Sequence, residues 1–317
     1  MPTFTKWDKL PSELREHSLS YCKTRELGRY AQLSNLCNDE IQKHNNVAPE
    51  ELSIGDMKNR KNGMMITAKY PSNHYFCLYF VAASENTHKL VRSSSGLLAA
   101  NQSLENYPIL EGNARQAAFK YLEKILRHTT RTEIRGICVD CRKWPNELKR
   151  IPAVFKASGW TVVMYQSMYD AFMSFMNEAV NVKNVYLFTN SLDRSIKSLP
   201  AHFFKSSFFR QLEYADIALE SMISDEDFLS SRAKSLTLNC DTITENAINQ
   251  KIRNWLESQN DIKFMIKLEE EDRILDKQVI LQNLPAQRSN RCFKIQRQDG
   301  KIGTIRIHDD GVKFNVD

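Results

Sequence analysis

Glycine is scarce in this chain, with 10 residues among 317. The motifs GxGxxG, GxSxG and GxxxxGK followed by Ser or Thr are absent, so the sequence lacks the turns that cradle a nucleotide phosphate or hold a nucleophilic serine. The 7 histidines are scattered, without HExxH or a pair four residues apart, which argues against a zincin site. These absences exclude the most recognisable nucleotide-binding and hydrolase classes.

The cysteines also give little indication of a catalytic or metal-binding site. The 7 cysteines are odd in number and irregularly spaced, which fits free thiols in a reducing compartment better than a disulfide framework. Cys138 and Cys141 form a CxxC that could supply half of a zinc site or a redox pair, but no second CxxC or HxxxH supplies the other ligands. The favoured interpretation places Cys138 in a buried strand between Ile137 and Val139. We therefore predict no metal, no cofactor and no enzymatic activity.

Long apolar runs and a strong charge imbalance are also missing. The longest nearly apolar stretch, residues 75–83, is far shorter than the ~20 residues of a membrane span, and the first residues lack the apolar core of a signal peptide. Lys plus Arg number 44 against 38 for Asp plus Glu, and the excess is spread along the chain. It is too small to indicate nucleic acid as a partner. We predict a soluble protein, cytoplasmic or nuclear or both, that binds neither membrane nor nucleic acid.

The chain does contain enough apolar residues for a folded core. Hydrophobic residues make up 42% of the sequence, including 16 Phe, and this length is typical of about two compact units. Changes in hydrophobic periodicity and in the positions of turn residues divide the chain into three regions. These are a helical segment at 4–46, a strand-rich connecting region at 47–110, and an α/β region at 111–317.

The leucines of segment 4–46 have the spacing of three short amphipathic helices. Pro11 suits the first turn of a helix, and Thr24 and Ser34 are suitable N-caps for the second and third. Three such helices are too few to bury all their leucines, because modules of this size usually need support from outside. The segment is therefore expected to present an apolar side to a partner.

Residues 10–41, LPSELREHSLSYCKTRELGRYAQLSNLCNDEI, resemble the F-box. In that family the motif docks a Skp-type adaptor, which links it to a cullin ubiquitin ligase. The resemblance implies that the adaptor-facing positions are Leu10, Pro11, Leu14, Leu19, Leu27 and Leu33. Three positions depart from the family pattern. The family prefers Ile or Val at the position of Ser18 and Leu at the position of Cys22, and it often has Trp at the position of Cys37. The alternative is a small helical cap that packs only on the rest of this chain.

The sequence after residue 46 predicts strands that alternate with helices. Short apolar runs at 64–66, 75–81 and 90–91, separated by turn residues, indicate strands in hairpins. Further β-prone runs lie at 134–139, 160–164, 185–188, 212–219, 236–238 and 262–268. These six are spaced close to the ~20–29 residues of a leucine-rich repeat, which predicts an α/β solenoid of that kind. A doubly wound α/β sheet is the alternative.

Helix signals lie between these strands, and a hairpin signal lies near the end of the chain. Apolar residues repeat with helical spacing after Asn113, Ser167 and Thr244, each of which is a suitable N-cap. The pair Asp299-Gly300 predicts a tight turn between strands at 293–296 and 302–307. Gly303 is expected at a β-bulge, and the hairpin is expected to cap the open end of the solenoid.

The C-terminal region is similar to the F-box-associated regions of nematode F-box proteins. The likeness rests on AKSLTLNCDTITENAINQKIRNWLE, then DKQVILQNLP, then KIQRQDGKIGTIRI, and covers residues 230–317 best. Together the two resemblances imply the substrate-recognition subunit of a Skp–cullin–F-box ubiquitin ligase, which captures a protein target with its C-terminal domain. Tyr186, Tyr214 and Arg210 are candidate contacts, and ordinary packing or solvation is the favoured alternative for each. The alternatives are a non-catalytic interaction scaffold with a weakened F-box, and an enzyme that uses Cys138 and Cys141.

Overall fold

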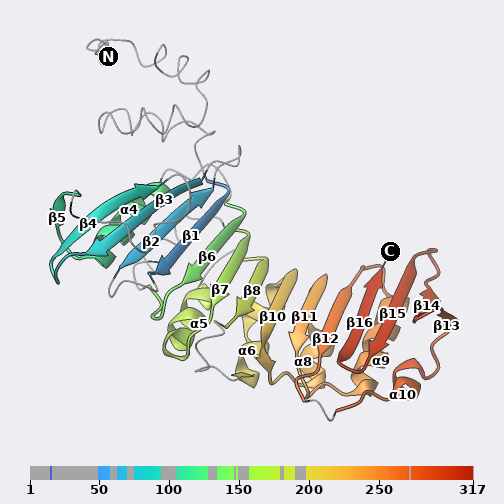
Figure 1. Cartoon of the computed structure of the whole chain (residues 1–317). Helices are drawn as coiled ribbons and strands as arrows, with labels where there is room; N and C mark the ends of the chain where they lie inside the picture. The colour runs from blue at the N-terminus through green and yellow to red at the C-terminus, as the bar shows by residue number, and fades with distance from the viewer. Residues whose placement is uncertain are drawn as a thin grey trace. The chain divides into compact units, whose positions relative to one another are not determined.

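The computed structural model (Figure 1) describes residues 15, 49–57, 63–69, 75–93, 105, 107–127, 134–145, 148, 157–178, 182–189, 198–270 and 273–316. Residues 4–46 lie outside this part except for Arg15, so the three predicted helices and the adaptor-facing positions Leu10, Pro11, Leu14, Leu19, Leu27 and Leu33 stay predictions. The chain divides into two compact units. The first comprises residues 1–141 and 145–158, and the second comprises residues 142–144 and 159–317.

The first unit contains an antiparallel sheet covered by one long helix. Its strands are β1 (Glu51–Asp56), β2 (Met64–Lys69), β3 (Tyr75–Ala82), β4 (Thr87–Ser93) and β5 (Ile109–Glu111), each paired with the next, and β6 (Gly136–Asp140) runs parallel to β1. The helix α4 (Ala114–Arg127) packs on β2 and β3. Asn113 caps it, because its Oδ1 accepts the backbone N–H of Arg115. The predicted hairpins and the predicted helix after Asn113 are confirmed.

The second unit contains parallel strands that lie side by side in sequence order. They are β7 (Gly159–Val163), β8 (Asn184–Phe188), β10 (Tyr214–Ser221), β11 (Ser235–Asn239) and β12 (Lys263–Lys267), and the short β9 (Ser198–Leu199) pairs with the end of β10. Each of the six predicted runs from 134 to 268 contributes a strand. The mixed α/β class is therefore confirmed. A doubly wound sheet reverses its strand order at a switch point, and the described parallel strands show no such reversal.

Short helices connect these parallel strands (Figure 1). They are η5 (Gln166–Met168), α5 (Tyr169–Glu178), α6 (Ala201–Lys205), α7 (Ser207–Gln211), α8 (Asp225–Ser230) and α9 (Glu245–Glu257), and a further helix, α10 (Lys277–Leu281), follows β12. Thr244 caps α9 as predicted, because its Oγ1 accepts the N–H of Ala247. The N-cap predicted at Ser167 is wrong. Ser167 lies inside η5, a single turn of 3₁₀ helix that precedes α5. Its hydroxyl donates to the carbonyl of Arg142 and therefore does not cap α5.

The C-terminal strands are antiparallel. They are β13 (Gln287–Ser289), β14 (Cys292–Gln296), β15 (Ile302–His308) and β16 (Gly311–Val316), and β16 lies between β15 and β12. The predicted hairpin is formed by β14 and β15. The predicted bulge at Gly303 is wrong, because Gly303 pairs in regular register with Ile295 and Val316. The glycine is needed for space: a Cβ there would lie 2.7 Å from the Phe314 ring and 3.0 Å from Trp255.

The helices cover one face of the sheet in the second unit. Trp255 of α9 contacts Phe314 of β16, with ring centroids 5.1 Å apart, and Phe228 of α8 contacts Phe264 of β12 at 5.6 Å. Along β10, buried Ala215, Ile217 and Leu219 alternate with exposed residues. This alternation is typical of a sheet packed on one face and open to solvent on the other. None of the helices in the described ranges has the length and the apolar composition of a membrane span.

Candidate functional site: the open face of the second sheet

We use the term open face for the side of the second unit's sheet, from β8 to β14, that is opposite the helices. Residues on this side alternate with the buried residues of each strand, so the strand register determines which of them are neighbours. Two groups of side chains stand out on it: exposed aromatic residues on β8 and β10, and basic residues on β12, β16, β15 and β14.

The aromatic patch consists of Tyr186 and Phe188 on β8 and Tyr214 on β10. These side chains are 45%, 36% and 42% exposed. Tyr186 pairs with Asp216, two residues after Tyr214, so the two tyrosines are diagonal neighbours on the same face. Large exposed aromatic residues that lie together are typical of protein-binding surfaces.

Acidic and neutral residues separate the aromatic patch from the basic residues. Asp216 and Glu220 are exposed on β10, on the same face as Tyr214. On the next strand, Ser235 pairs with Tyr214 and Thr237 pairs with Asp216. The open face therefore changes along the sheet from aromatic and acidic, through neutral, to basic.

The basic cluster consists of Lys263 and Lys267 on β12, Lys313 on β16, Arg306 on β15 and Lys294 on β14. Its central feature is a cross-strand pair of like charges, because Lys313 lies directly opposite Arg306. Like charges in this position destabilise a sheet. Within the described part of the chain, none of the five side chains forms an ion pair or a hydrogen bond. The cluster is therefore a concentration of positive charge without a counter-ion from the described residues.

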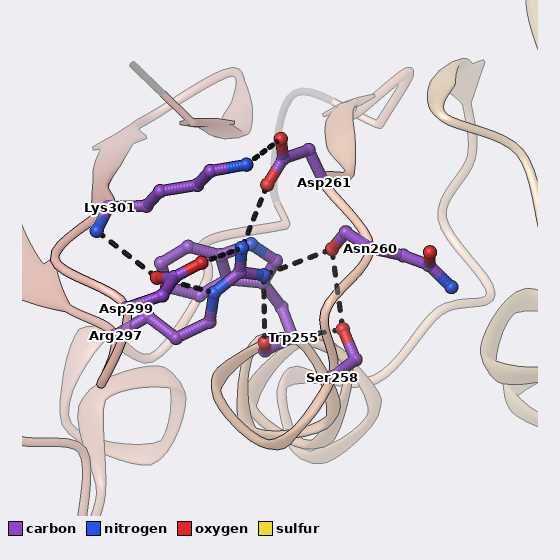
Figure 2. Close-up of polar contacts among 7 residues, drawn as sticks. All are labelled: Trp255, Ser258, Asn260, Asp261, Arg297, Asp299 and Lys301. Atoms are coloured by element: carbon purple, nitrogen blue, oxygen red, sulfur yellow. Dashed lines mark hydrogen bonds and ion pairs between the residues drawn. The ribbon is translucent and has the colours of Figure 1, made fainter.

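A separate group of charges around Arg297 is balanced internally (Figure 2). Arg297, with a side chain only 3% exposed, forms ion pairs with Asp299 at 2.7 Å and Asp261 at 3.0 Å. Its guanidinium carbon lies 4.9 Å from the centroid of the Trp255 ring. Lys301 donates to Asp261 at 2.6 Å. Hydrogen bonding to Arg297 lowers the pKa of Asp299 to about 2, and hydrogen bonding to Lys301 lowers the pKa of Asp261.

The Arg297 group has a structural role. Its two cations and two carboxylates neutralise one another, so little charge is left for a ligand. Arg297 also donates to the carbonyl of Asn260 at 3.2 Å, and its contact with Trp255 connects the β14–β15 turn to the end of α9. This network fixes the hairpin that carries Arg306 and Lys294, and it thereby positions part of the basic cluster.

Lys251 on α9 is likewise structural. Its ammonium group donates to the carbonyls of Phe228, Leu229 and Ser231 at 2.9, 3.1 and 2.7 Å, and so caps the C-terminal end of α8. Burial lowers the pKa of Lys251 to about 8, whereas the three carbonyl acceptors favour the charged form. Because all three N–H groups are used, this lysine is not available as a nucleophile.

The CxxC cysteines lie in and just after strand β6. Cys138 lies in β6, as predicted, and the buried Cys141 follows it with its Sγ 3.8 Å from the carbonyl oxygen of Ile54. Burial raises the pKa of both thiols, so both are protonated at neutral pH and weak as nucleophiles or metal ligands. The described residues contain no group of three His, Cys, Asp or Glu side chains that could hold a metal ion.

Of the predicted target contacts, the structure brings two together. Tyr186 and Tyr214 lie on the open face, whereas Arg210 is exposed in the last turn of α7. Sequence reasoning missed the basic cluster. Its local signal is the alternation of Lys263, Met265 and Lys267 with buried Phe264 and Ile266, but its neighbours come from strands that only the fold places beside β12.

The chain matches no protein-family model, no curated protein and no solved structure. The residues of the open face are therefore the observation from which the function is inferred.

Proposed function

We propose that this protein is a non-catalytic substrate receptor that binds a protein target through the open face of its second unit. The observation that carries the proposal is the aromatic patch of Tyr186, Phe188 and Tyr214, exposed on the same sheet face as a basic cluster. Tyrosine and arginine contribute much of the binding energy of protein interfaces, because they combine large contact area with hydrogen-bonding groups. A sheet also presents these side chains on a rigid surface, which lowers the entropy lost on binding.

The proposed architecture for target capture is a leucine-rich-repeat-like α/β solenoid formed by β7, β8, β10, β11 and β12. Parallel strands in sequence order support it, since right-handed crossovers that always advance in one direction bring the connecting helices to one face. Each strand and its helix would then bury apolar surface against the next unit. The antiparallel strands from β16 to β13 would cap one end of the stack.

The proposed role in the cell is that of the recognition subunit in a Skp–cullin–F-box ubiquitin ligase. The F-box resemblance of residues 10–41 supports this role. In this proposal Leu10, Pro11, Leu14, Leu19, Leu27 and Leu33 contact a Skp-type adaptor, and a cullin is recruited through that adaptor. The receptor itself performs no chemistry and holds the target near a charged conjugating enzyme.

A scaffold with a weakened F-box is the second candidate. Ser18 and Cys22 favour it, because each places a smaller or more polar side chain where the family has an apolar one. Such a scaffold would keep the open face and its target but would not bind the adaptor.

Adaptor binding by the purified full chain tests the ligase role. We expect the chain to co-elute with a purified Skp-type adaptor in size-exclusion chromatography. The double variant Leu10→Ala, Pro11→Ala is expected to lose co-elution while its far-UV circular dichroism stays nearly unchanged. If the wild type does not bind, the scaffold is the correct candidate. If the double variant binds as well as the wild type, the assigned adaptor surface is wrong.

A further inference from the structure

We infer that the target segment bound by the open face is an extended peptide with Asp or Glu residues at one end and an apolar residue at the other. This inference rests on the proposed function, because it names the class of target that the receptor holds. It starts from the positions of Lys263, Lys313, Arg306 and Lys294, which belong to four adjacent strands.

The arrangement of charge in the second unit supports an acidic partner. Other basic side chains of this unit do have acidic partners: Glu213 pairs with Lys183 at 3.1 Å and with Lys234 at 2.6 Å, and Arg297 pairs with two aspartates. The basic cluster of the open face has no such match within the described residues, and it keeps the repulsive pair of Lys313 and Arg306. Carboxylates of a bound peptide would relieve this repulsion.

The spacing of the strands fits an extended segment that crosses them. Neighbouring strands lie ~4.8 Å apart, so the four strands from β12 to β14 span about 15 Å. An extended chain advances ~3.3 Å per residue and turns alternate side chains to one side. About five residues with acidic side chains at alternate positions would therefore cover the basic cluster. The aromatic patch lies three strands beyond β12, so about ten residues reach both groups.

The acidic residues of the open face favour a peptide over a nucleic acid. A single strand would stack its bases on Tyr186, Phe188 and Tyr214 and place its phosphates alongside. Asp216 and Glu220 lie on the same face as these rings and would repel the phosphates. A peptide avoids this repulsion, because only its acidic end needs to carry negative charge.

Fluorescence anisotropy with the purified full chain tests the inference. The probe is a labelled ten-residue peptide with Glu at positions 1, 3 and 5 and Leu at position 9. The comparison probes are the same peptide with Gln in place of Glu, and a single-stranded RNA of ten nucleotides. The double variant of the basic cluster is Arg306→Gln, Lys313→Gln. The matched control is Lys205→Gln, Arg232→Gln, which removes the same two charge types from α6 and from the exposed segment between α8 and β11.

We expect the Glu peptide to bind more tightly than the Gln peptide and the RNA, and to weaken as salt is added. The open-face variant should bind the Glu peptide about fivefold to tenfold more weakly, and the control variant should bind it as the wild type does. Equal binding of the Glu and Gln peptides, tighter binding of the RNA, or an unchanged affinity in the open-face variant would overturn the inference.

The same preparations separate this inference from the ligase role. A chain that binds the adaptor but not the Glu peptide contradicts the acidic target and leaves the receptor role in place. A chain that binds the Glu peptide but not the adaptor supports the acidic target and contradicts the ligase role. The melting temperature of the open-face variant is measured alongside, and it should equal or exceed that of the wild type because the substitutions remove a repulsion.

Discussion

Lys313 of β16 and Arg306 of β15 lie directly opposite each other on the solvent side of a sheet, with no acidic partner among the described residues. A sequence selected only for stability would not retain such a pair, because opposite charges in this position stabilise a sheet and like charges destabilise it. Stability given up at a surface is typical of a binding site. The pair is therefore the strongest sign that this face has a charged partner.

Removing one charge of this pair should stabilise the protein. We expect Lys313→Gln to raise the free energy of unfolding by about 0.2–1 kcal/mol, since it ends the repulsion with Arg306 and keeps most of the side-chain stem. Urea denaturation measures the change. Lys205→Gln on α6 is the control and should change stability by less than about 0.5 kcal/mol. A marked loss of stability in Lys313→Gln would show that the ammonium group has a favourable partner in the fold.

The Arg297 network should make a large contribution to the stability of the second unit. Replacing Arg297 by Met keeps an apolar contact with Trp255 but removes the ion pairs with Asp299 and Asp261 and the hydrogen bond to Asn260. We expect a loss of about 1–3 kcal/mol in urea denaturation. A loss within the error of the wild-type value would contradict the structural role of this group.

The same network predicts how stability depends on acid. Asp299 has an ordinary pKa of 3.8, and hydrogen bonding to Arg297 lowers it to about 2 in the folded protein. Because the unfolded chain binds this proton more readily, the contribution of Asp299 to stability is present above the unfolded pKa of 3.8 and is lost as the pH falls through about 2. In Arg297→Met this loss should be smaller. Unfolding midpoints measured between pH 5 and 2 test it, and identical slopes in both proteins would contradict it.

Gly303 should not tolerate a side chain. A Cβ at this position would lie 2.7 Å from Cε2 of Phe314, inside the contact between Phe314 and Trp255. We expect Gly303→Ala to cost about 1–3 kcal/mol through overpacking. Gly136→Ala in β6 is the matched control, because the nearest atom to its Cβ is 3.9 Å away. Thermal unfolding compares the two variants, and an equal effect in both would mean that the rings can move aside.

Local patterns predicted the elements that are long or strictly alternating. The helices α4 and α9 follow from apolar residues at helical spacing, and the strands follow from short β-prone runs. The helices α6, α7 and α8 contain only five or six residues each, too few for a helical period to be visible. The sequence prediction ends with a two-stranded hairpin and does not include β16, although Val312, Phe314 and Val316 alternate with Lys313 and Asn315.

The candidate site depends on pairings that no local pattern contains. Tyr186 and Tyr214 become neighbours through the parallel pairing of β8 and β10, and Lys313 meets Lys263 and Lys267 only because β16 inserts beside β12. Strand order is set by long-range packing. The sequence could therefore nominate single residues, but it could not show that aromatic and basic residues share one face.

Quantitative affinity purification of the tagged full-length protein from its own cells tests the central claim most directly. Three forms are compared: the wild type, the open-face variant Arg306→Gln, Lys313→Gln, and the adaptor variant Leu10→Ala, Pro11→Ala. The account predicts that the open-face variant keeps the adaptor and loses a protein with an acidic segment, whereas the adaptor variant keeps that protein and loses the adaptor. Identical sets of bound proteins in all three forms would contradict it.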